Sequence, residues 1–203
     1  MKAIIIAITI LFSTAYAKEN TTEKEYSKYD KATLAGGCFW CMEPPYEKLP
    51  GIYEVVSGYS GGNEVNPKYE DVAGGKTGHR EAVTIYFDPK VISYKKVIEI
   101  FWKQINPTDS KGQFVDRGFQ YSSAIYYHSQ EQRAIAQKSK DELDKSKRYK
   151  LPIVTPIIEF KSFYKAEEYH QDYYRKNPLR YKYYRWNSGR DQYLEKIWKA
   201  DKS

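Results

Sequence analysis

The pattern of apolar and polar positions along the chain predicts short strands that alternate with helices. Residues 81–87 alternate strictly, with Val83, Ile85 and Phe87 on one face and the intervening residues on the other. A period of two is typical of a strand that has one buried face. Four further segments predict strands on similar grounds, at residues 32–35, 52–59, 123–127 and 153–160.

Helices are predicted where apolar residues recur at helical spacing behind a capping residue. Ser93 precedes such a segment and the Asn106-Pro107 pair ends it. The apolar stripe of this helix consists of Val97, Ile98, Phe101, Trp102 and Ile105. Ser129 and Gln132 form a capping box at the start of a long charged helix. Further helices are predicted within residues 39–49, at 162–169 and at 191–199.

The order of the main elements is strand, helix, strand, strand, helix, strand, which is the order of a split βαβ unit. The predicted fold class is therefore α+β, a two-layer sandwich with a split βαβ (ferredoxin-like) core and a long irregular C-terminal segment. Pro152 and Pro156 lack backbone donors, so the strand at 153–160 is expected at a sheet edge. The Gly-, Asn- and Pro-rich residues 60–78 predict a long loop of the kind that often carries function. No internal repeat or linker divides residues 32–203, which we predict to be a single domain.

The first residues of the chain differ from this domain. Lys2 is followed by an apolar run at 3–12 and then by small residues up to Ala17. This arrangement is typical of a secretory signal peptide, here residues 1–17. The polar residues 18–31 have no apolar periodicity and are predicted to be a flexible lead-in. We therefore expect an exported protein, periplasmic or secreted. Because no second apolar span follows, we expect no stable membrane insertion after signal removal.

Charge and composition limit the partners of the protein. The 33 Lys and Arg residues outnumber the 26 Asp and Glu residues, giving a formal net charge of +7 that could attract nucleic acid. Acidic residues are interspersed with the basic ones, however, as at 138–150, and export argues against a nucleic-acid partner. The 21 tyrosines supply both apolar area and hydroxyls, which suits a polar, aromatic-lined groove. The 203 residues can bury a core without disulfides, and we expect a monomer.

Candidate chemistry centres on the only two cysteines, Cys38 and Cys41, which are separated by Phe39 and Trp40. A structural disulfide that closes so short a loop would stabilise the fold by only about 2 kcal/mol. A zinc site would need two more ligands, and the three histidines share no recognisable spacing with the pair. Two redox interpretations remain. One is a thiol–disulfide oxidoreductase, for which the two bulky aromatic residues are unfavourable. The other is a cycle in which Cys38 attacks an oxidised substrate and Cys41 condenses with the resulting sulfenic acid.

The residues around the pair predict its local structure. Gly36 and Gly37 permit a sharp turn, and a helix that starts there would favour a thiolate through its N–H dipoles. Pro44 and Pro45 fit the first turn of a helix that begins near Pro44. The cysteines are then expected in a turn just ahead of the regular helix.

Several short motifs follow one another along the chain. They are Gly36-Gly37-Cys38-Phe39-Trp40, Leu49-Pro50-Gly51, Gly58-Tyr59, Gly61-Gly62, Asn66-Pro67, Tyr69, Gly78-His79-Arg80-Glu81-Ala82-Val83, residues 116–121, and Glu168-Tyr169-His170-Gln171-Asp172-Tyr173. Together they resemble the type A class of peptide-methionine sulfoxide reductases. The resemblance extends over about residues 33–178, and several motifs in one order are more specific than any single motif.

The resemblance implies a role for each matching residue. Cys38 looks like the nucleophile that attacks the sulfoxide sulfur, and Glu81 matches the acid that protonates the sulfoxide oxygen. A carboxyl can donate a proton at neutral pH only if burial raises its pKa. Tyr69 and Tyr121 match hydroxyls that hydrogen-bond the sulfoxide oxygen and stabilise developing charge.

Three further positions are implied to bind or orient the substrate. Phe39 and Trp40 match the walls that hold the substrate methyl group, and Asp116 matches a position for which we favour an orienting role. The histidines are interpreted as structural or surface residues and not as ligands: His79, His128 and His170.

The chain also departs from its relatives. Many of them have glycine where this chain has Cys41 and carry resolving cysteines near the C-terminus, where this chain has none. Cys41 is therefore the only intramolecular candidate for the resolving thiol. Phe119 replaces a threonine that is common at its position. Arg80 places a positive charge next to Glu81 in the sequence, which would oppose a raised pKa.

These implications lead to one hypothesis, an exported repair enzyme that reduces methionine S-sulfoxide, free or in oxidised proteins. Its Cys38–Cys41 disulfide would be reduced by a thioredoxin-like donor, and two thiols suffice for a turnover without metal, flavin or nicotinamide cofactor. The alternative enzyme is the thiol–disulfide oxidoreductase. A third alternative is a binding module that recognises oxidised methionine without reducing it.

Overall fold

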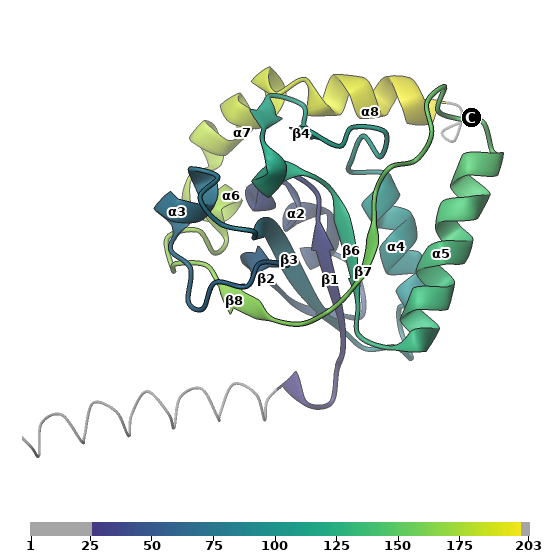
Figure 1. The fold of residues 1–203 in the computed structure, drawn as a ribbon, viewed down its shortest axis with the longest axis horizontal. Coiled ribbons are helices and arrows are strands. Elements are labelled where there is room, and N and C mark those ends of the chain that lie inside the picture. The colour runs from purple at the N-terminus through teal and green to yellow at the C-terminus, as the bar shows by residue number, and fades with distance from the viewer. Residues whose placement is uncertain (1–25, 200–203) are drawn as a thin grey trace, which may run out of the picture.

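Six strands form the central sheet of the protein, in the order β7-β6-β1-β3-β2-β8 (Figure 1). The computed structural model describes residues 26–199. The strands of this sheet are β1 (Asp30–Ala35), β2 (Ile52–Ser60), β3 (Arg80–Phe87), β6 (Ala124–Tyr127), β7 (Ile157–Glu159) and β8 (Phe163–Lys165). A separate two-stranded sheet consists of β4 (Gly112–Gln113) and β5 (Asp116–Arg117).

Helices surround this sheet and continue along one end of the molecule (Figure 1). They are α2 (Pro44–Glu47), α3 (Tyr69–Ala73), α4 (Tyr94–Trp102), α5 (Gln130–Lys145), α6 (Tyr173–Lys176), α7 (Pro178–Asn187) and α8 (Arg190–Trp198). Two short 3₁₀ turns are η1 (Phe39–Cys41) and η2 (Phe119–Tyr121). The protein is thus a mixed α/β fold. Within residues 26–199, none of the helices is long and apolar enough to cross a membrane.

The central strands are held in register by their apolar face. β1 lies between β6 and β3 and runs antiparallel to both, and β2 runs antiparallel to β3. Leu34 stands opposite Val83 on one side and Ile125 on the other, and all three side chains are buried. Burying each such side chain contributes about 1.5–3 kcal/mol, so a shift by one residue would expose the whole row.

The helices α4 and α5 begin at the predicted caps and cover the apolar face of the sheet. Ser93 Oγ accepts the backbone N–H of Lys96 at 3.2 Å, and Ser129 Oγ accepts that of Gln132 at the same distance. The helices α4 and α5 pack against each other, and they contact β1 and β6 respectively. The predicted stripe of the first helix lies in the core, and Trp102 Nε1 donates to Ser139 Oγ of the second at 2.9 Å.

Two predictions for the region after residue 150 need correction. The helix predicted at 162–169 is wrong, because residues 163–165 form β8 on the outer edge of β2. A Cβ on Gly58 would lie 2.3 Å from the carbonyl oxygen of Tyr164 and 2.4 Å from the Phe163 ring. The glycine therefore permits the close approach of β8. The predicted strand at 153–160 is shorter, at residues 157–159, and lies at the sheet edge as expected.

The irregular C-terminal segment of the predicted fold is also wrong. The helices α6, α7 and α8 occupy this part of the chain, of which 191–199 was predicted as a helix (Figure 1). Pro178 opens α7, and the buried side of these helices includes Tyr181 and Leu194. Tyrosine rings supply much of the apolar face, and because their hydroxyls also suit solvent, the helical period is hard to recognise in the sequence.

The two predictions for the N-terminus, a signal peptide and a flexible lead-in, fall at the limit of the described residues. The predicted signal peptide and residues 18–25 of the lead-in lie outside them. Tyr26 stacks on Tyr86 with ring centroids 4.2 Å apart, and Tyr29 stacks on Tyr53 at 4.3 Å. β1 already begins at residue 30, so the folded domain starts slightly before the predicted boundary at residue 32.

Candidate active site

The two cysteines lie in the 3₁₀ turn η1, between β1 and α2. The backbone N–H of Cys41 donates to the carbonyl of Cys38 at 3.0 Å, which closes the turn. Residues three apart in a 3₁₀ turn have eclipsed side chains, so both thiols lie on the same side, where they are hydrogen-bonded to each other. Both are free and buried. Pro44 opens α2 after the turn, as predicted, and does not separate the two sulfurs.

Gly37 provides the backbone geometry on which this turn depends. Its φ is +84°, and a Cβ there would lie 2.6 Å from Cβ of Gln113 and 2.9 Å from Nη2 of Arg190. A residue with a side chain would therefore be strained both by its conformation and by its neighbours. The turn is packed tightly enough to fix the direction of both thiols.

Glu81 lies on β3, buried against this turn. Its Oε2 accepts the backbone N–H of Phe39 at 3.0 Å, which places the carboxyl next to Cys38. Burial raises the pKa of Glu81 to about 8, with a smaller contribution from the charge of Asp116, while the bond from Phe39 opposes the shift. The carboxyl is thus mainly protonated at neutral pH and can donate a proton.

Arg80 was expected to oppose a raised pKa of Glu81, but its guanidinium points away from this carboxyl. Adjacent residues in a strand point to opposite faces. The Arg80 guanidinium donates to Ser122 Oγ at 2.8 Å and to Tyr126 Oη at 3.2 Å, and it lies 4.1 Å over the Phe119 ring. The phenylalanine that replaces threonine in this chain therefore packs on Arg80.

Tyr69 and Tyr121 reach the same site from two separate elements, α3 and η2. Burial raises the pKa of both phenols, to about 12 for Tyr69, and the charges of Glu81 and Cys38 act in the same direction. Both hydroxyls therefore remain protonated and can donate hydrogen bonds. The backbone N–H of Tyr69 donates to Glu167 Oε1 at 3.0 Å, which holds the start of α3.

An aromatic wall lies beside the turn. Trp40 stacks on Tyr173 with ring centroids 3.7 Å apart and planes 6° apart, and its Nε1 donates to His170 Nδ1 at 3.1 Å. The His170 ring also lies 5.0 Å from Phe39 and 4.3 Å from Tyr69. His170 thus packs against these predicted site residues, which agrees with the structural role predicted for it.

The pKa values of the two thiols shift in opposite directions because their surroundings differ. Burial raises the pKa of Cys38 well above its ordinary value, and the charges of Glu81 and Asp116 raise it further. The pKa of Cys41 falls to about 7, mainly through the hydrogen bond from Cys38 and then through the charges of Arg190 and Arg185. The cysteines lie in a short turn ahead of the regular helix, as the proline pair predicted, and the Phe39 N–H is bound to Glu81.

The C-terminal helices cover the resolving side of the pair. Tyr173 and Tyr181 pack on Cys41, and Arg185 Nη1 donates to the Cys41 carbonyl at 3.2 Å. Tyr184 of α7 donates to Asp116 Oδ2, so this predicted site residue is held by the same helix. Tyr181, Tyr184 and Arg185 were missed as site residues, because they lie beyond the matching motifs and only the fold returns them to the turn.

The arrangement combines two thiols, a buried carboxyl whose pKa is raised, two phenolic hydroxyls and an aromatic wall. No group of three or more metal-ligating side chains occurs among residues 26–199. The chain matches the model of the family described as peptide methionine sulfoxide reductase over residues 30–202. The chain belongs to the peptide methionine sulfoxide reductase family.

Individual relatives agree with this assignment. The chain is 55% identical over 171 residues to peptide methionine sulfoxide reductase MsrA of Listeria innocua, covering 84% of this chain and 97% of the relative. It is 51% identical over 200 residues to peptide methionine sulfoxide reductase MsrA/MsrB of Vibrio cholerae, covering 98% of this chain. The chain spans only 53% of that longer relative.

Solved structures of yeast Mxr1 share the fold. The reduced form superposes with a TM-score of 0.69 at 36% identity, covering 75% of this chain and 87% of Mxr1. Mxr1 in complex with Trx2 matches with a TM-score of 0.50 at 28% identity, covering 72% of this chain and 86% of that one. Both structures are of Mxr1 from Saccharomyces cerevisiae.

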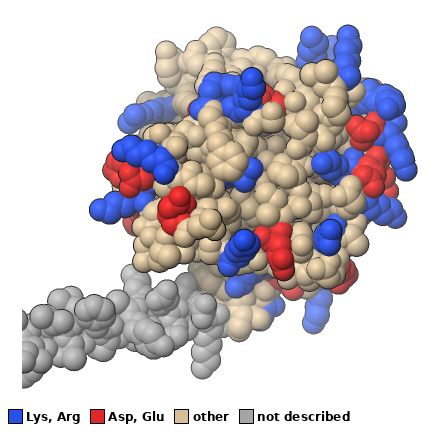
Figure 2. All heavy atoms as spheres, viewed as in Figure 1, with Lys and Arg blue, Asp and Glu red and all other residues tan. Residues whose placement is uncertain are grey.

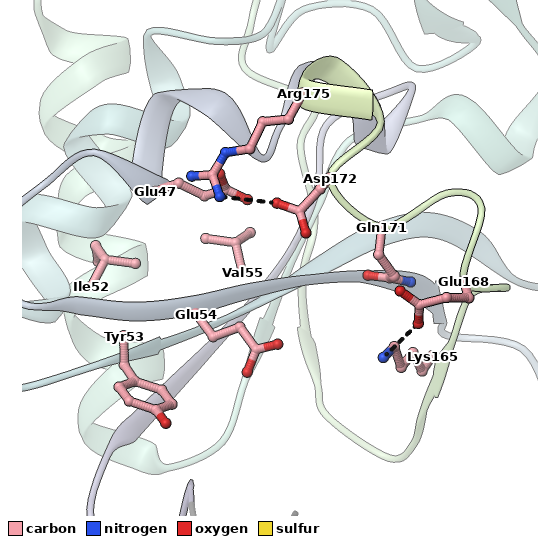
Figure 3. Close-up of a pocket in the computed structure, with 10 residues that line it drawn as sticks. All are labelled: Glu47, Ile52, Tyr53, Glu54, Val55, Lys165, Glu168, Gln171, Asp172 and Arg175. Carbon is pink, nitrogen blue, oxygen red and sulfur yellow. Dashed lines mark hydrogen bonds and ion pairs between the residues drawn. The ribbon is translucent and has the colours of Figure 1, made fainter. Parts of the chain in front are cut away.

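A separate hollow of about 230 Å³ lies outside the reductase site (Figure 3). In Figure 3 the carboxylates of Glu47 and Asp172 turn toward Arg175, at 2.8 and 3.3 Å. Lys165 pairs with Glu168 at 3.4 Å beside them. None of the predicted site residues lines this hollow. The Arg175–Glu47 pair connects α6 to α2, while the other two pairs are local.

A second buried carboxyl, that of Glu43, lies just after the cysteine turn and connects it to β2. Its Oε1 accepts Ser57 Oγ at 2.7 Å, while its Oε2 has no hydrogen-bond partner. Gln171 binds the backbone of Ser57 through both amide atoms, at 2.9 Å each. Burial raises the pKa of Glu43 to about 8. The carboxyl therefore ties the turn to β2 in its neutral form.

Replacing Glu43 with Gln is expected to flatten the dependence of stability on pH. Between pH 4.5 and about 8 the folded state holds a proton at Glu43 that the unfolded state lacks. The free energy of unfolding should thus fall as pH rises, by about 1.4 kcal/mol per pH unit for one proton. Glu43→Gln removes that contribution and keeps an oxygen for Ser57. Urea unfolding across this pH range measures the difference.

The exposed Glu142→Gln on α5 serves as the matched control and should follow the wild type at every pH. Glu81 contributes a slope of the same sign in all three proteins, because its pKa is also raised to about 8. Parallel curves for wild type and Glu43→Gln would contradict the prediction.

Proposed function

We propose that the chain reduces methionine S-sulfoxide to methionine, with free and protein-bound sulfoxide as substrates and Cys38 as the nucleophile. The observation that carries this proposal is the protonated carboxyl of Glu81, buried beside Cys38 and held by the Phe39 N–H at 3.0 Å. Membership of the reductase family supports thiol-dependent sulfoxide reduction. A buried acid next to a thiol supports a mechanism that needs both.

In the first step the Cys38 sulfur forms a bond to the substrate sulfur while Glu81 gives its proton to the sulfoxide oxygen. The oxygen then passes to Cys38, methionine leaves, and the proton of the Cys38 thiol replaces the one that Glu81 lost. One oxygen atom is transferred, so the sulfoxide is reduced and Cys38 is oxidised to a sulfenic acid. Tyr69 and Tyr121 donate hydrogen bonds to the oxygen as charge develops on it.

The aromatic wall supports a methyl sulfoxide as the substrate of this site. Phe39 and Trp40 supply an apolar surface beside the nucleophile, and the Trp40 ring is fixed by Tyr173 and by His170. A rigid wall can orient the methyl group so that the sulfur faces Cys38 and the oxygen faces the acid. Asp116 orients the site through its bond from Tyr184.

In the second step Cys41 attacks the oxidised sulfur of Cys38. The S–S bond forms, the S–O bond breaks, and the leaving oxygen takes protons to become water. The disulfide is then reduced by a thioredoxin-like donor, which would be an exported one if the predicted signal peptide acts. A structural relative, Mxr1, forms a complex with Trx2, which supports this class of partner.

The face shown in Figure 2 does not favour a nucleic-acid partner. On the face shown in Figure 2, Lys and Arg occupy several separate patches with Asp and Glu beside many of them. Nucleic-acid binding typically uses a continuous basic stripe. We propose a monomer whose partners are its sulfoxide substrates and its thioredoxin-like reductant.

The test is a single turnover of the reduced protein with one equivalent of methionine S-sulfoxide. One methionine per protein is expected, together with a mass loss of two hydrogens across Cys38 and Cys41. The R epimer, offered in the same way, is the matched control. Sulfoxide binding without methionine would make the protein a binding module. Reduction of a scrambled disulfide substrate without methionine formation would make it a thiol–disulfide oxidoreductase.

A further inference from the structure

Arg190 is the largest fully buried side chain among the described residues, with 1% of its surface exposed. It is the first residue of α8, and its guanidinium reaches back to the turn before Cys38. Nη2 donates to the Gly36 carbonyl at 3.1 Å, and Nη1 donates to the Gln104 carbonyl at 2.6 Å. The group lies 4.7 Å over the Phe114 ring, and its Nε has no partner.

The charge of this guanidinium is not neutralised by an ion pair. Within residues 26–199, no carboxylate lies within ion-pair distance of Arg190, whereas Arg185 is paired with Asp191 at 2.7 Å. An arginine stays ionised even when buried, and a buried cation that contacts only carbonyls is unfavourable without a nearby anion. The groups near it that can become anionic are Asp116 and Cys41.

We propose that Arg190 is a positioning residue of the resolving step: it fixes the Gly36–Gly37 turn and supplies the positive charge that keeps Cys41 as a thiolate. This inference rests on the proposed function. In the step, the electron pair of the Cys41 thiolate forms the S–S bond to Cys38. The S–O bond of the sulfenic acid breaks, and the leaving hydroxide takes a proton from Glu81, which solvent replaces.

The charges that face Cys41 from each neighbouring element are consistent with this role. The acids that oppose its thiolate are Asp116 of β5 and the Cys38 thiol once ionised, and Tyr181 of α7 packs on it as a neutral phenol. Arg185 favours the thiolate from α7 but shares its charge with Asp191. Arg190 is left as the unpaired cation on this side. The pKa of Cys41, lowered to about 7, agrees with that arrangement.

The test measures disulfide formation against pH after one equivalent of methionine sulfoxide, in the full chain. In the wild type the rate should rise with pH as Cys41 loses its proton, and the midpoint of that rise is the measured quantity. Arg190→Gln should move the midpoint up by about one pH unit and slow resolution about tenfold below it, because tenfold less thiolate is present. Methionine release in the same samples reports any disturbance of the turn itself, and its dependence on pH should match that of the wild type. Arg190→Lys, which keeps the charge, should restore the wild-type midpoint.

Arg148→Gln is the matched control. Arg148 also donates to a backbone carbonyl, that of Ile197, at 2.8 Å, and lies 4.1 Å over the Trp198 ring, but it does not act on Cys41. Asp116→Asn keeps the test decisive should Arg190→Gln not fold. Asp116→Asn removes an anion that opposes the Cys41 thiolate and that competes with it for the positive charge of Arg190. The pH midpoint of disulfide formation should therefore move below the wild-type value.

The outcomes separate this inference from the proposed function. No methionine from the wild-type protein would overturn the proposed function and this inference with it. Methionine formation with an unchanged midpoint in Arg190→Gln would overturn the inference alone. A midpoint in Asp116→Asn at or above the wild-type value would do the same.

Discussion

Replacing Glu81 with Gln is expected to slow methionine formation in a single turnover by about 10²–10⁴-fold, the usual contribution of a positioned general acid. Gln is nearly isosteric, and its amide oxygen can still accept the Phe39 N–H, so the cysteine turn should be preserved. What the variant loses is the proton that the sulfoxide oxygen must receive. Rapid quenching and chromatography of methionine would measure the rate.

The pH profile gives this prediction a second readout. Burial raises the pKa of Glu81 to about 8, so its acid form is present below that pH and is lost above it. The rate of methionine formation by the wild type should therefore fall as pH rises through 8, and the Glu81→Gln variant should not show this decrease. Glu43→Gln, which changes the other buried carboxyl near the turn, is the control and should retain it. If Glu81→Gln formed methionine at a rate within tenfold of the wild type, Glu81 would not be the general acid.

Cys41→Ser is expected to form one methionine per protein and then stop, with steady-state activity reduced at least about 100-fold. The first step uses Cys38 and Glu81, neither of which the substitution changes. The second step needs a thiol beside Cys38, and Cys38 and Cys41 are the only cysteines of the chain. Cys38 should therefore accumulate as sulfenic acid, which mass spectrometry detects as one added oxygen.

The control for this experiment is Cys38→Ser, which should form no methionine in any turnover. Serine at position 41 keeps a small polar side chain under Tyr173 and Tyr181, so the covering helices should remain in place. Undiminished steady-state activity with a thioredoxin-like protein as donor would show that Cys38 is reduced directly. Cys41 would then have no resolving role.

The local features of this fold could be predicted from the sequence because neighbouring residues decide them. The alternation at 81–87 predicted β3, and the serine caps predicted the starts of α4 and α5. The proline pair predicted that the cysteines lie in a turn before α2. The tyrosine-rich C-terminal segment was misjudged, since the rings that form its buried face carry hydroxyls.

The candidate site divides in the same way. The motifs named Cys38, Glu81, Tyr69 and Tyr121, and their roles stay predictions until the variants are measured. The sequence could not place Arg80 on the opposite face from Glu81, where it packs on Phe119. Nor could it show that the Phe39 N–H, expected to favour a thiolate, is bound by Glu81.

By itself, then, the sequence determined the strands, the capped helices and the pair of thiols at a spacing from which a disulfide can close. Only the tertiary structure decided which charged groups surround each thiol. Cys38 faces the acids of β3 and β5, while Cys41 lies under arginines from α7 and α8, more than 140 residues away in the chain. A pKa depends on burial and on charges close in space, and folding alone brings those charges together.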